Sequence, residues 1–379
     1  MWTPENWYLQ ARDNAQKTAD LIRNRAELML GVIAQGKPAG MPLEEALQEM
    51  EAFHQQRLAA VPDLFRYPEL RGMRELIDAE WRGTRDGAGL DDRLLASYYT
   101  GYVYYSRCLH AGIPELGCTY IYFPTSEYGP LLANNLDSSP AEKFGPPHWP
   151  ALNEHLLIGG VSSGIFMDEQ SPEIFPVPVE KLVARYCRTT DEAAEMMTRY
   201  NHFWGPGNKI VVDRNHRVAM IEKSACRIGV RFSPDGFGFI ASMTAEEPGM
   251  HAYLNDRRTA SLKARKLPEV CEDTLFWEDH DLRRQELTEM LDEARKNPTL
   301  ETLRRMIQFR EPGKAFVCVN GEKLLPDSAP GAFTLRTTIW VLNERRALWW
   351  AKEGETPSFE NRKPDVRFPD VRFPDVLEW

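Results

Sequence analysis

Histidine and closely spaced cysteine are scarce in this sequence, which removes the common metal-binding motifs. The chain of 379 residues contains eight histidines and six cysteines. No two cysteines form a CxxC pair, and no histidine is followed by a second one four positions later. The usual zinc-ligand spacings are therefore missing, as is the P-loop of NTPases. We expect neither a metal ion nor a cofactor to be needed.

Positive charge and long apolar runs are also in short supply. The net charge is -10, whereas non-specific binding to nucleic acid needs clustered Lys and Arg. No apolar run approaches the roughly 18 residues that suggest a membrane span. The polar first residues, MWTPENWYLQ, lack the order of a signal peptide. We therefore expect a cytoplasmic protein with reduced thiols that binds neither nucleic acid nor a membrane.

Two kinds of pattern divide the chain near residue 117. Before it, apolar residues recur at helical spacing. After it come short β-rich runs separated by turn residues, among them CTYIYF, KIVVD, RVAMIE, RIGVRF and FGFIAS. Helical patterns then occupy 178–200, 257–267, 280–296 and 298–308. Strands and helices are thus partly segregated, which predicts an α+β fold of packed antiparallel sheets with outer helices.

Three segments follow from these patterns. Residues 1–117 form a helical segment packed on the body, and residues 118–355 form the body itself. Residues 356–379 contain the repeat DVRFPDVRFPDV, in which proline recurs too often for a helix or a central strand. We expect this tail to be extended.

Cys118 is the main candidate for chemistry. A cysteine at the start of an apolar strand is usually an inert buried thiol. Here, however, Gly117 precedes it, so the backbone can bend without a Cβ in the way. If CTYIYF and GPLLANN pair around PTSEYG, then Asn134, Asn135 and Asp137 return beside the thiol. This arrangement would place a carboxylate and two amides next to Cys118.

The stretch GCTYIYFPTSEYGPLLANNLD resembles the self-cleavage motif of the N-terminal-nucleophile (Ntn) hydrolases. It is most similar to the peptidase C45 branch, the acyl-coenzyme A:6-aminopenicillanic acid acyltransferase family, and more distantly to bile salt hydrolases. The family pattern of Gly-Cys-Thr, a hairpin and Asn-x-Asp falls on Gly117, Cys118, Thr119, Asn135 and Asp137. Weaker matches in the flanking segments extend the resemblance to about residues 73–270.

The resemblance implies a four-layer αββα sandwich and a chain that cuts itself before Cys118. The freed α-amine would then be the base for the thiol, so no histidine is needed. Ordinary pKa values near 8 and 8.5 make that proton transfer nearly isoenergetic. Asp137 would orient the amine, and Asn135 would fix the hairpin or donate toward the substrate.

The resemblance also implies substrate and oxyanion contacts. These fall on Thr119, Asn134, Ser162, Thr244 and Arg258, with Arg257 and Arg265 as close rivals of Arg258. The sequence departs from the family at three of these places. Asn134 stands where bile salt hydrolases carry Arg, Ala245 follows Thr244 where relatives have Asn, and Ser162 stands in place of another Asn.

The function that the resemblance implies is a self-processed cysteine amidohydrolase or N-acyltransferase. Its substrate would be a small amide or acyl-thioester, with acyl-coenzyme A open as a co-substrate. The direction of the reaction is open, because water or an amine can resolve an acyl-enzyme. The two cleavage fragments should stay associated, and a homo-oligomer is open. Two alternatives remain: an Ntn-fold binding protein with little or no turnover, and an unrelated enzyme in which Cys118 is core.

Overall fold

The computed structural model describes most of the chain. The described residues are 3–37, 40–61, 70–101, 103–104, 118–138, 141–145, 147–162, 179–201, 206–224, 227–312, 314–323, 325–328 and 331–352, without the side chains of 162, 264 and 265. The expected cleavage partner Gly117 and the expected tail 356–379 therefore lie outside this part.

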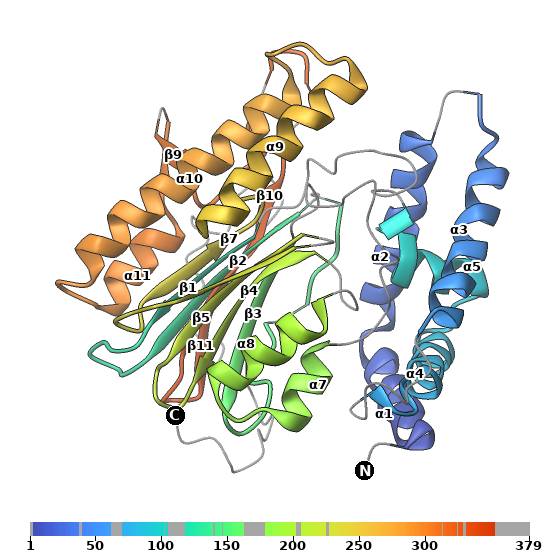
Figure 1. Ribbon diagram of the computed structural model, residues 1–379, viewed down its shortest axis with the longest axis horizontal. Helices are drawn as coiled ribbons and strands as arrows, with labels where there is room; N and C mark the ends of the chain where they lie inside the picture. The colour runs from blue at the N-terminus through green and yellow to red at the C-terminus, as the bar shows by residue number, and fades with distance from the viewer. Residues whose placement is uncertain are drawn as a thin grey trace.

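Most of the described residues before 118 are helical (Figure 1). The helices are α1 (Pro4–Lys17), α2 (Ala19–Gly36), α3 (Leu43–Ala59), α4 (Met73–Ala88), α5 (Asp92–Ala96) and the π-helical turn η2 (Ser97–Gly101). Local sequence explains their starts. The Thr3 side chain accepts a hydrogen bond from the Asn6 backbone and Pro4 opens α1, while Asp91 caps α5 in the same way.

One five-stranded antiparallel sheet contains the strand that begins at Cys118. Its order is β11-β10-β2-β1-β7, formed by β1 (Cys118–Phe123), β2 (Leu131–Ser138), β7 (Gly238–Ala241), β10 (Phe333–Val341) and β11 (Arg346–Ala351). β1 and β2 form a hairpin in which Cys118 lies opposite Leu136 and Thr119 opposite Asn135. The expected pairing of CTYIYF with the following apolar run is confirmed.

A second, four-stranded antiparallel sheet packs against the first. It has the order β3-β4-β5-β6, formed by β3 (Leu156–Ser162), β4 (Gly207–Asp213), β5 (Val218–Lys223) and β6 (Ile228–Phe232). A core between the sheets joins Tyr122 and Leu132 of the first to Leu157 and Ile210 of the second. The approach is close: a Cβ at Gly159 would lie 2.5 Å from a ring carbon of Tyr120. A larger residue at 159 would push the sheets apart.

Helices cover the outer face of each sheet. Side chains of α10 (Glu272–Ala294) and α11 (Leu300–Ile307) form a core with β1, β2, β7 and β10. Side chains of α7 (Val179–Tyr186) and α8 (Thr190–Arg199) pack on β3, β4 and β5. The remaining elements are α9 (Pro248–Arg265) and the short pair β8 (Arg310–Glu311) and β9 (Ala315–Phe316). The expected α+β class with antiparallel sheets is confirmed.

The helices before residue 118 share a core with the body. Trp7 of α1 and Leu76 of α4 belong to the same buried cluster as Leu182 of α7 and Val211 of β4. Figure 1 shows α1 to α5 gathered on the far side of α7 and α8 from the sheets, with α9, α10 and α11 at the other side of the molecule. Among the described residues, no helix is both long and apolar enough to cross a membrane.

Candidate active site

Cys118 begins β1 at the end of the first sheet, and its backbone is held by Ser242. The Cys118 N–H donates to Ser242 Oγ at 2.9 Å, and the Ser242 N–H donates to the Cys118 carbonyl at 3.0 Å. Ser242 directly follows β7, whose pairing with β1 starts at Thr119 opposite Ala241. The fully buried Ser242 thus fixes the nitrogen that self-cleavage would turn into an α-amine.

The thiol of Cys118 lies against the backbone of Asp137. Its Sγ is 3.9 Å from the Asp137 carbonyl oxygen, which accepts a weak hydrogen bond from the S–H. Burial, and second the negative charge of Asp137, raise the pKa of the thiol to about 12. In the intact chain the thiol is therefore neutral at physiological pH. The nearly equal pKa values expected from ordinary thiols and amines do not apply to this state.

The Asp137 carboxylate lies on the opposite face of the sheet from the thiol. Because Cys118 pairs with Leu136, these two side chains share a face, and the next residue along β2 points to the other face. There Asp137 Oδ1 accepts from Thr334 Oγ1 at 2.6 Å, and Oδ2 accepts from Arg283 Nη1 at 3.1 Å. Burial raises the pKa of Asp137 to about 6, while the Arg283 charge opposes that rise.

Asn135 faces the helices, not the thiol. Its Nδ2 donates to the carbonyls of Ile307 and Val317 at 2.7 and 2.9 Å, and its Oδ1 accepts from Thr337 Oγ1 at 2.7 Å. Both of its amide hydrogens are used in these contacts. The geometry therefore gives Asn135 the role of fastening α11 and residue 317 to β2, and it does not bring the amide to Cys118.

Asn134 lies on the same face as the thiol. It is opposite Tyr120 in the hairpin, two residues along β1 from Cys118. Its Nδ2 donates to the carbonyls of Thr119 and Asn135 at 3.2 and 2.9 Å, and its side chain is buried. In this state Asn134 stiffens the hairpin next to Cys118.

Thr119 and Thr244, two further residues expected at the site, lie in different places. Thr119 is fully buried on the helix-facing side, and its Oγ1 has no hydrogen-bond partner among the described residues. Thr244 donates through Oγ1 to the Ala241 carbonyl at 3.1 Å, so its hydroxyl closes the turn after β7. The Asn208 amide donates to both ends of that turn, the carbonyls of Ala241 and Thr244. This turn contains Ser242, so Thr244 and Asn208 support the group that holds Cys118.

Ser162 ends β3 opposite Gly207, and its side chain is outside the described part. Residues 160–164 also match the G-x-S-x-G pattern of a nucleophile elbow. That pattern has chemical meaning where a strand turns into a helix at the top of an α/β-hydrolase sheet. Here Ser162 closes an edge strand of an antiparallel sheet, which does not support the elbow reading.

Arg258 is buried and ties α9 to α10. Its Nη1 donates to Asp281 Oδ2 at 2.6 Å and its Nη2 to the Met243 carbonyl at 3.1 Å. Met243 follows Ser242, so Arg258 braces the same turn. Arg257 is half-buried, and the Arg265 side chain is outside the described part. Arg258 is therefore placed at the turn that carries Ser242.

Three residues near Cys118 have no counterpart in the sequence motif: Ser242, Arg283 and Arg336. Arg336 in β10 pairs with Leu136, which in turn pairs with Cys118, so its side chain shares the face of the thiol. Its guanidinium donates to the Gly145 carbonyl, and burial lowers its pKa. A buried cation on this face is suited to a carboxylate or a developing negative charge.

Among the described residues, no group of three or more His, Cys, Asp and Glu side chains could hold a metal ion. The expectation that no metal or cofactor is needed stays a prediction.

Comparisons with known proteins add little beyond these contacts. No family model matches the chain, and no curated protein matches it. Among solved structures, two variants of the conjugated bile acid hydrolase from Clostridium perfringens are similar to it. Each is 10% identical and covers 67% of this chain and 84% of that chain, with TM-scores of 0.33 and 0.32. Similarity this low does not establish an activity.

Proposed function

We propose that this protein is a self-processed cysteine amidohydrolase or N-acyltransferase that uses Cys118 as its nucleophile. The observation that carries the proposal is the position of Cys118 at the first residue of a sheet strand, with its nitrogen held by Ser242 Oγ at 2.9 Å. A backbone nitrogen that already has a fixed acceptor is suited to become an oriented α-amine.

Self-processing would begin with attack of Cys118 Sγ on the carbonyl carbon of Gly117. The Gly117–Cys118 C–N bond breaks, a thioester forms, and the thiol proton passes to the departing nitrogen. Water then hydrolyses the thioester, which leaves a carboxylate on Gly117 and a free thiol and α-amine on Cys118. The intact chain would be an inactive precursor, because the lone pair of a peptide nitrogen is delocalised into the carbonyl and cannot serve as the general base for turnover.

Turnover would use the new amine as general base. It would take the S–H proton as the sulfur attacks a substrate carbonyl, and the leaving amine or thiol would depart with a proton. Water or a second amine would then resolve the acyl-enzyme, so hydrolysis and transfer share this step. The neutral thiol of the intact chain is consistent with activation only after cleavage, since a new ammonium beside the sulfur would lower the thiol pKa.

Asp137 would act on the thiol through its backbone and through local charge, since its carboxylate is bound by Arg283 and Thr334. Arg336 and Ser242 are the side chains best placed to contact the reacting groups, Arg336 as an electrostatic partner and Ser242 as the acceptor that orients the amine. Removing a side chain that donates to the oxyanion, the role Arg336 would have, typically lowers the rate by about 10²–10³.

Turnover of a library of small amides and acyl-thioesters tests the proposal. We expect release of amine or thiol by the wild-type protein, none by Cys118→Ala, and the acyl group on the peptide that begins at Cys118 after quenching. Cys187→Ala, which removes a buried thiol distant from the site, is the matched control and should keep full activity. Equal turnover by Cys118→Ala would reject the assignment, and absence of turnover in processed wild type would favour the binding-protein alternative.

A further inference from the structure

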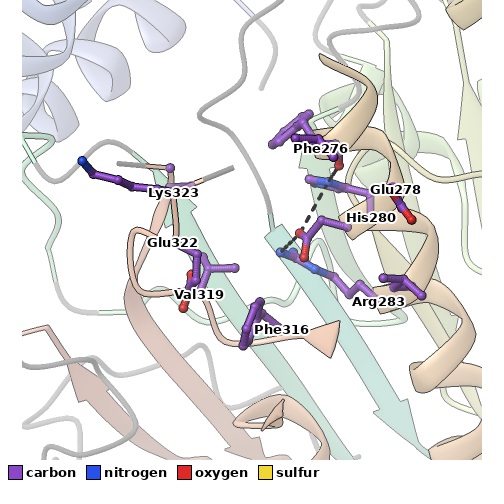
Figure 2. A pocket seen from close by; sticks show the side chains of 13 residues that line it. Phe276, Glu278, His280, Arg283, Phe316, Val319, Glu322 and Lys323 are labelled. Atoms are coloured by element: carbon purple, nitrogen blue, oxygen red, sulfur yellow. Dashed lines mark hydrogen bonds and ion pairs between the residues drawn. The ribbon is translucent and has the colours of Figure 1, made fainter. Parts of the chain in front are cut away.

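A cavity lies between α10 and the segment that connects β9 to β10. Its volume is about 260 Å³, and its lining is mostly apolar. Figure 2 shows Phe276 and Glu278 of α10 on one wall, and Phe316, Val319 and Lys323 on the other. An apolar cavity of about 150 Å³ can already hold benzene, so this one has room for a phenyl ring.

Several apolar side chains of this cavity have surface that a ligand can contact. Leu282 is 41% exposed although it is a large hydrophobic residue, and Leu275 and Phe316 are half-buried. All three line the cavity. An apolar group that entered the cavity would remove this surface from water, which is favourable.

The two walls of the cavity carry exposed charges of opposite sign. Glu278 is exposed on α10, and Lys323 is exposed on the opposite wall (Figure 2). Neither forms an ion pair with another described residue, whereas Asp279 and Glu322 of the same lining both have arginine partners. A ligand with an apolar group between a cation and an anion would therefore match the cavity.

The described part of the chain ends beside this cavity. The Lys352 N–H donates to the Leu335 carbonyl at 2.9 Å, and Lys352 Nζ lies 4.7 Å from the centre of the Phe333 ring. Phe333 directly follows Ala332, which lines the cavity. Residues 353–379, which contain the DVRFP repeat, are therefore tethered next to it.

Each copy of the repeat has the chemistry that matches the cavity. An arginine immediately precedes the phenylalanine, Phe368 or Phe373, and an aspartate follows it by two positions. The proline after each phenylalanine restricts that residue to an extended backbone, so less entropy is lost on binding. Sixteen residues lead from Lys352 to Phe368, and a flexible chain of this length spans roughly 20–25 Å.

We propose that the cavity between α10 and residues 316–332 is a docking site for the C-terminal repeat of this same chain. The phenylalanine of one copy fills the apolar part of the cavity, its arginine pairs with Glu278 and its aspartate pairs with Lys323. The second copy is an equivalent ligand, so the two copies exchange at one site.

Docking is independent of the proposed enzymatic activity. The cavity is lined by α10, which covers the outer face of the first sheet, whereas Cys118 packs against the core between the two sheets. Binding of the repeat needs neither the thiol nor cleavage of the chain. Cys118→Ala should therefore dock its tail as the wild type does, even if the enzymatic proposal fails.

Methyl NMR of the full-length protein tests docking directly. A phenyl ring in the cavity shifts the methyl resonances of Leu275 and Leu282 through its ring current. The double variant Phe368→Ala/Phe373→Ala should therefore move these resonances, and either single variant should move them less, because the other copy takes its place. Phe359→Ala is the matched control, since Phe359 lies in the tail but outside the repeat, and it should leave them unchanged.

A fluorescently labelled peptide, DVRFPDV, tests the same site by competition. It should bind full-length Phe368→Ala/Phe373→Ala about tenfold more tightly than the wild type, because tethering holds the competing wild-type tail at about millimolar concentration. The peptide DVRAPDV should bind neither protein.

A charge reversal locates the peptide. In the double variant, Glu278→Lys should weaken peptide binding about two- to fivefold, the range for one exposed ion pair. Glu293→Lys is the matched control, because Glu293 is an exposed glutamate of the same helix outside the cavity, and it should leave the affinity unchanged.

Three outcomes would each overturn the proposal. They are unchanged Leu275 and Leu282 resonances in the double variant, equal affinity of the peptide for wild type and double variant, and peptide binding that Glu278→Lys does not weaken. If the peptide binds neither protein, the methyl resonances decide. Ring-current shifts that disappear as the wild type is diluted would assign the cavity to the tail of a second copy, which also contradicts docking within one chain.

Discussion

Cys118 is held in a state that disfavours ionisation before any cleavage occurs. The thiol contacts a backbone carbonyl, and its pKa of about 12 reflects burial first and the charge of Asp137 second. A thiol nucleophile reacts as the thiolate, so the intact chain stores the sulfur in an unreactive form. Formation of an ammonium next to it would reverse this effect.

The first prediction follows from that pKa. In a chain that does not cleave itself, the rate at which iodoacetamide alkylates Cys118 should be low at pH 7. This rate should rise about tenfold per pH unit, without a plateau, up to pH 10. Peptide mapping of labelled protein measures the rate at this one cysteine. A plateau near pH 8 would show an ordinary thiol pKa and contradict the account.

The second prediction concerns Ser242. Ser242→Ala removes the acceptor of the Cys118 nitrogen, so both processing and turnover should fall by about 10²-fold while the fold is kept. Ser233→Ala is a suitable control, because the buried Ser233 also accepts a hydrogen bond from a backbone N–H, that of Asp235 at 3.4 Å, away from the site. Processing by Ser242→Ala at the wild-type rate would remove this residue from the mechanism.

At the scale of elements, the β1–β2 hairpin is what the sequence predicted best. Turn residues and apolar alternation indicated both strands and their pairing, and the observed register brings residue 137 back to Cys118. The sequence did not predict on which face of the sheet each side chain lies. Whether Asn135 and Asp137 face the thiol depends on a register that a shift of one residue would invert.

Long-range partners were not predictable. Ser242 lies 124 residues from Cys118 and Arg283 lies 146 residues from Asp137, and no local pattern marks either of them. Their positions depend on how β7 pairs with β1 and how α10 packs on β2. Asn135, which matches the family motif, turned out to bind the backbone of α11.

The third prediction concerns the buried ion pair that joins β2 to α10. Arg283→Met leaves the buried Asp137 carboxylate without its cation, so it should lower the free energy of unfolding at neutral pH by about 3–5 kcal/mol. Asp137→Asn should lose less, because the amide resembles the protonated acid that the raised pKa favours. The double variant should lose less than the sum of the two. Urea denaturation of the four proteins gives the coupling, and additive losses would show that the pair does not act as a unit.

The fourth prediction is a pH dependence of stability. Burial raises the pKa of Asp137 from 3.8 to about 6, so the folded protein binds this proton more tightly than the unfolded chain. Its contribution to stability is complete below pH 3.8 and is lost as pH rises to about 6. Relative to wild type, Asp137→Asn should therefore show a free energy of unfolding that rises by up to about 1.4 kcal/mol per pH unit across this window. If the free energies of unfolding of the two proteins change with pH in parallel, the raised pKa is contradicted.

At the scale of the whole molecule, two antiparallel sheets with outer helices hold Cys118 at the end of a strand while the helices before it pack on the body. Trp7 and Leu76 are buried in a core shared with α7 and α8, so a break after residue 117 would expose apolar surface if the parts separated. Both fragments of a cleaved chain should therefore remain together under native conditions.

The most direct test of the central claim is the intact mass of purified wild-type protein under denaturing conditions. The account predicts two masses, for residues 1–117 and 118–379, that elute together on native size exclusion, while Cys118→Ala gives a single chain of 379 residues. A wild-type protein that stays a single intact chain and still hydrolyses amides would contradict the α-amine mechanism.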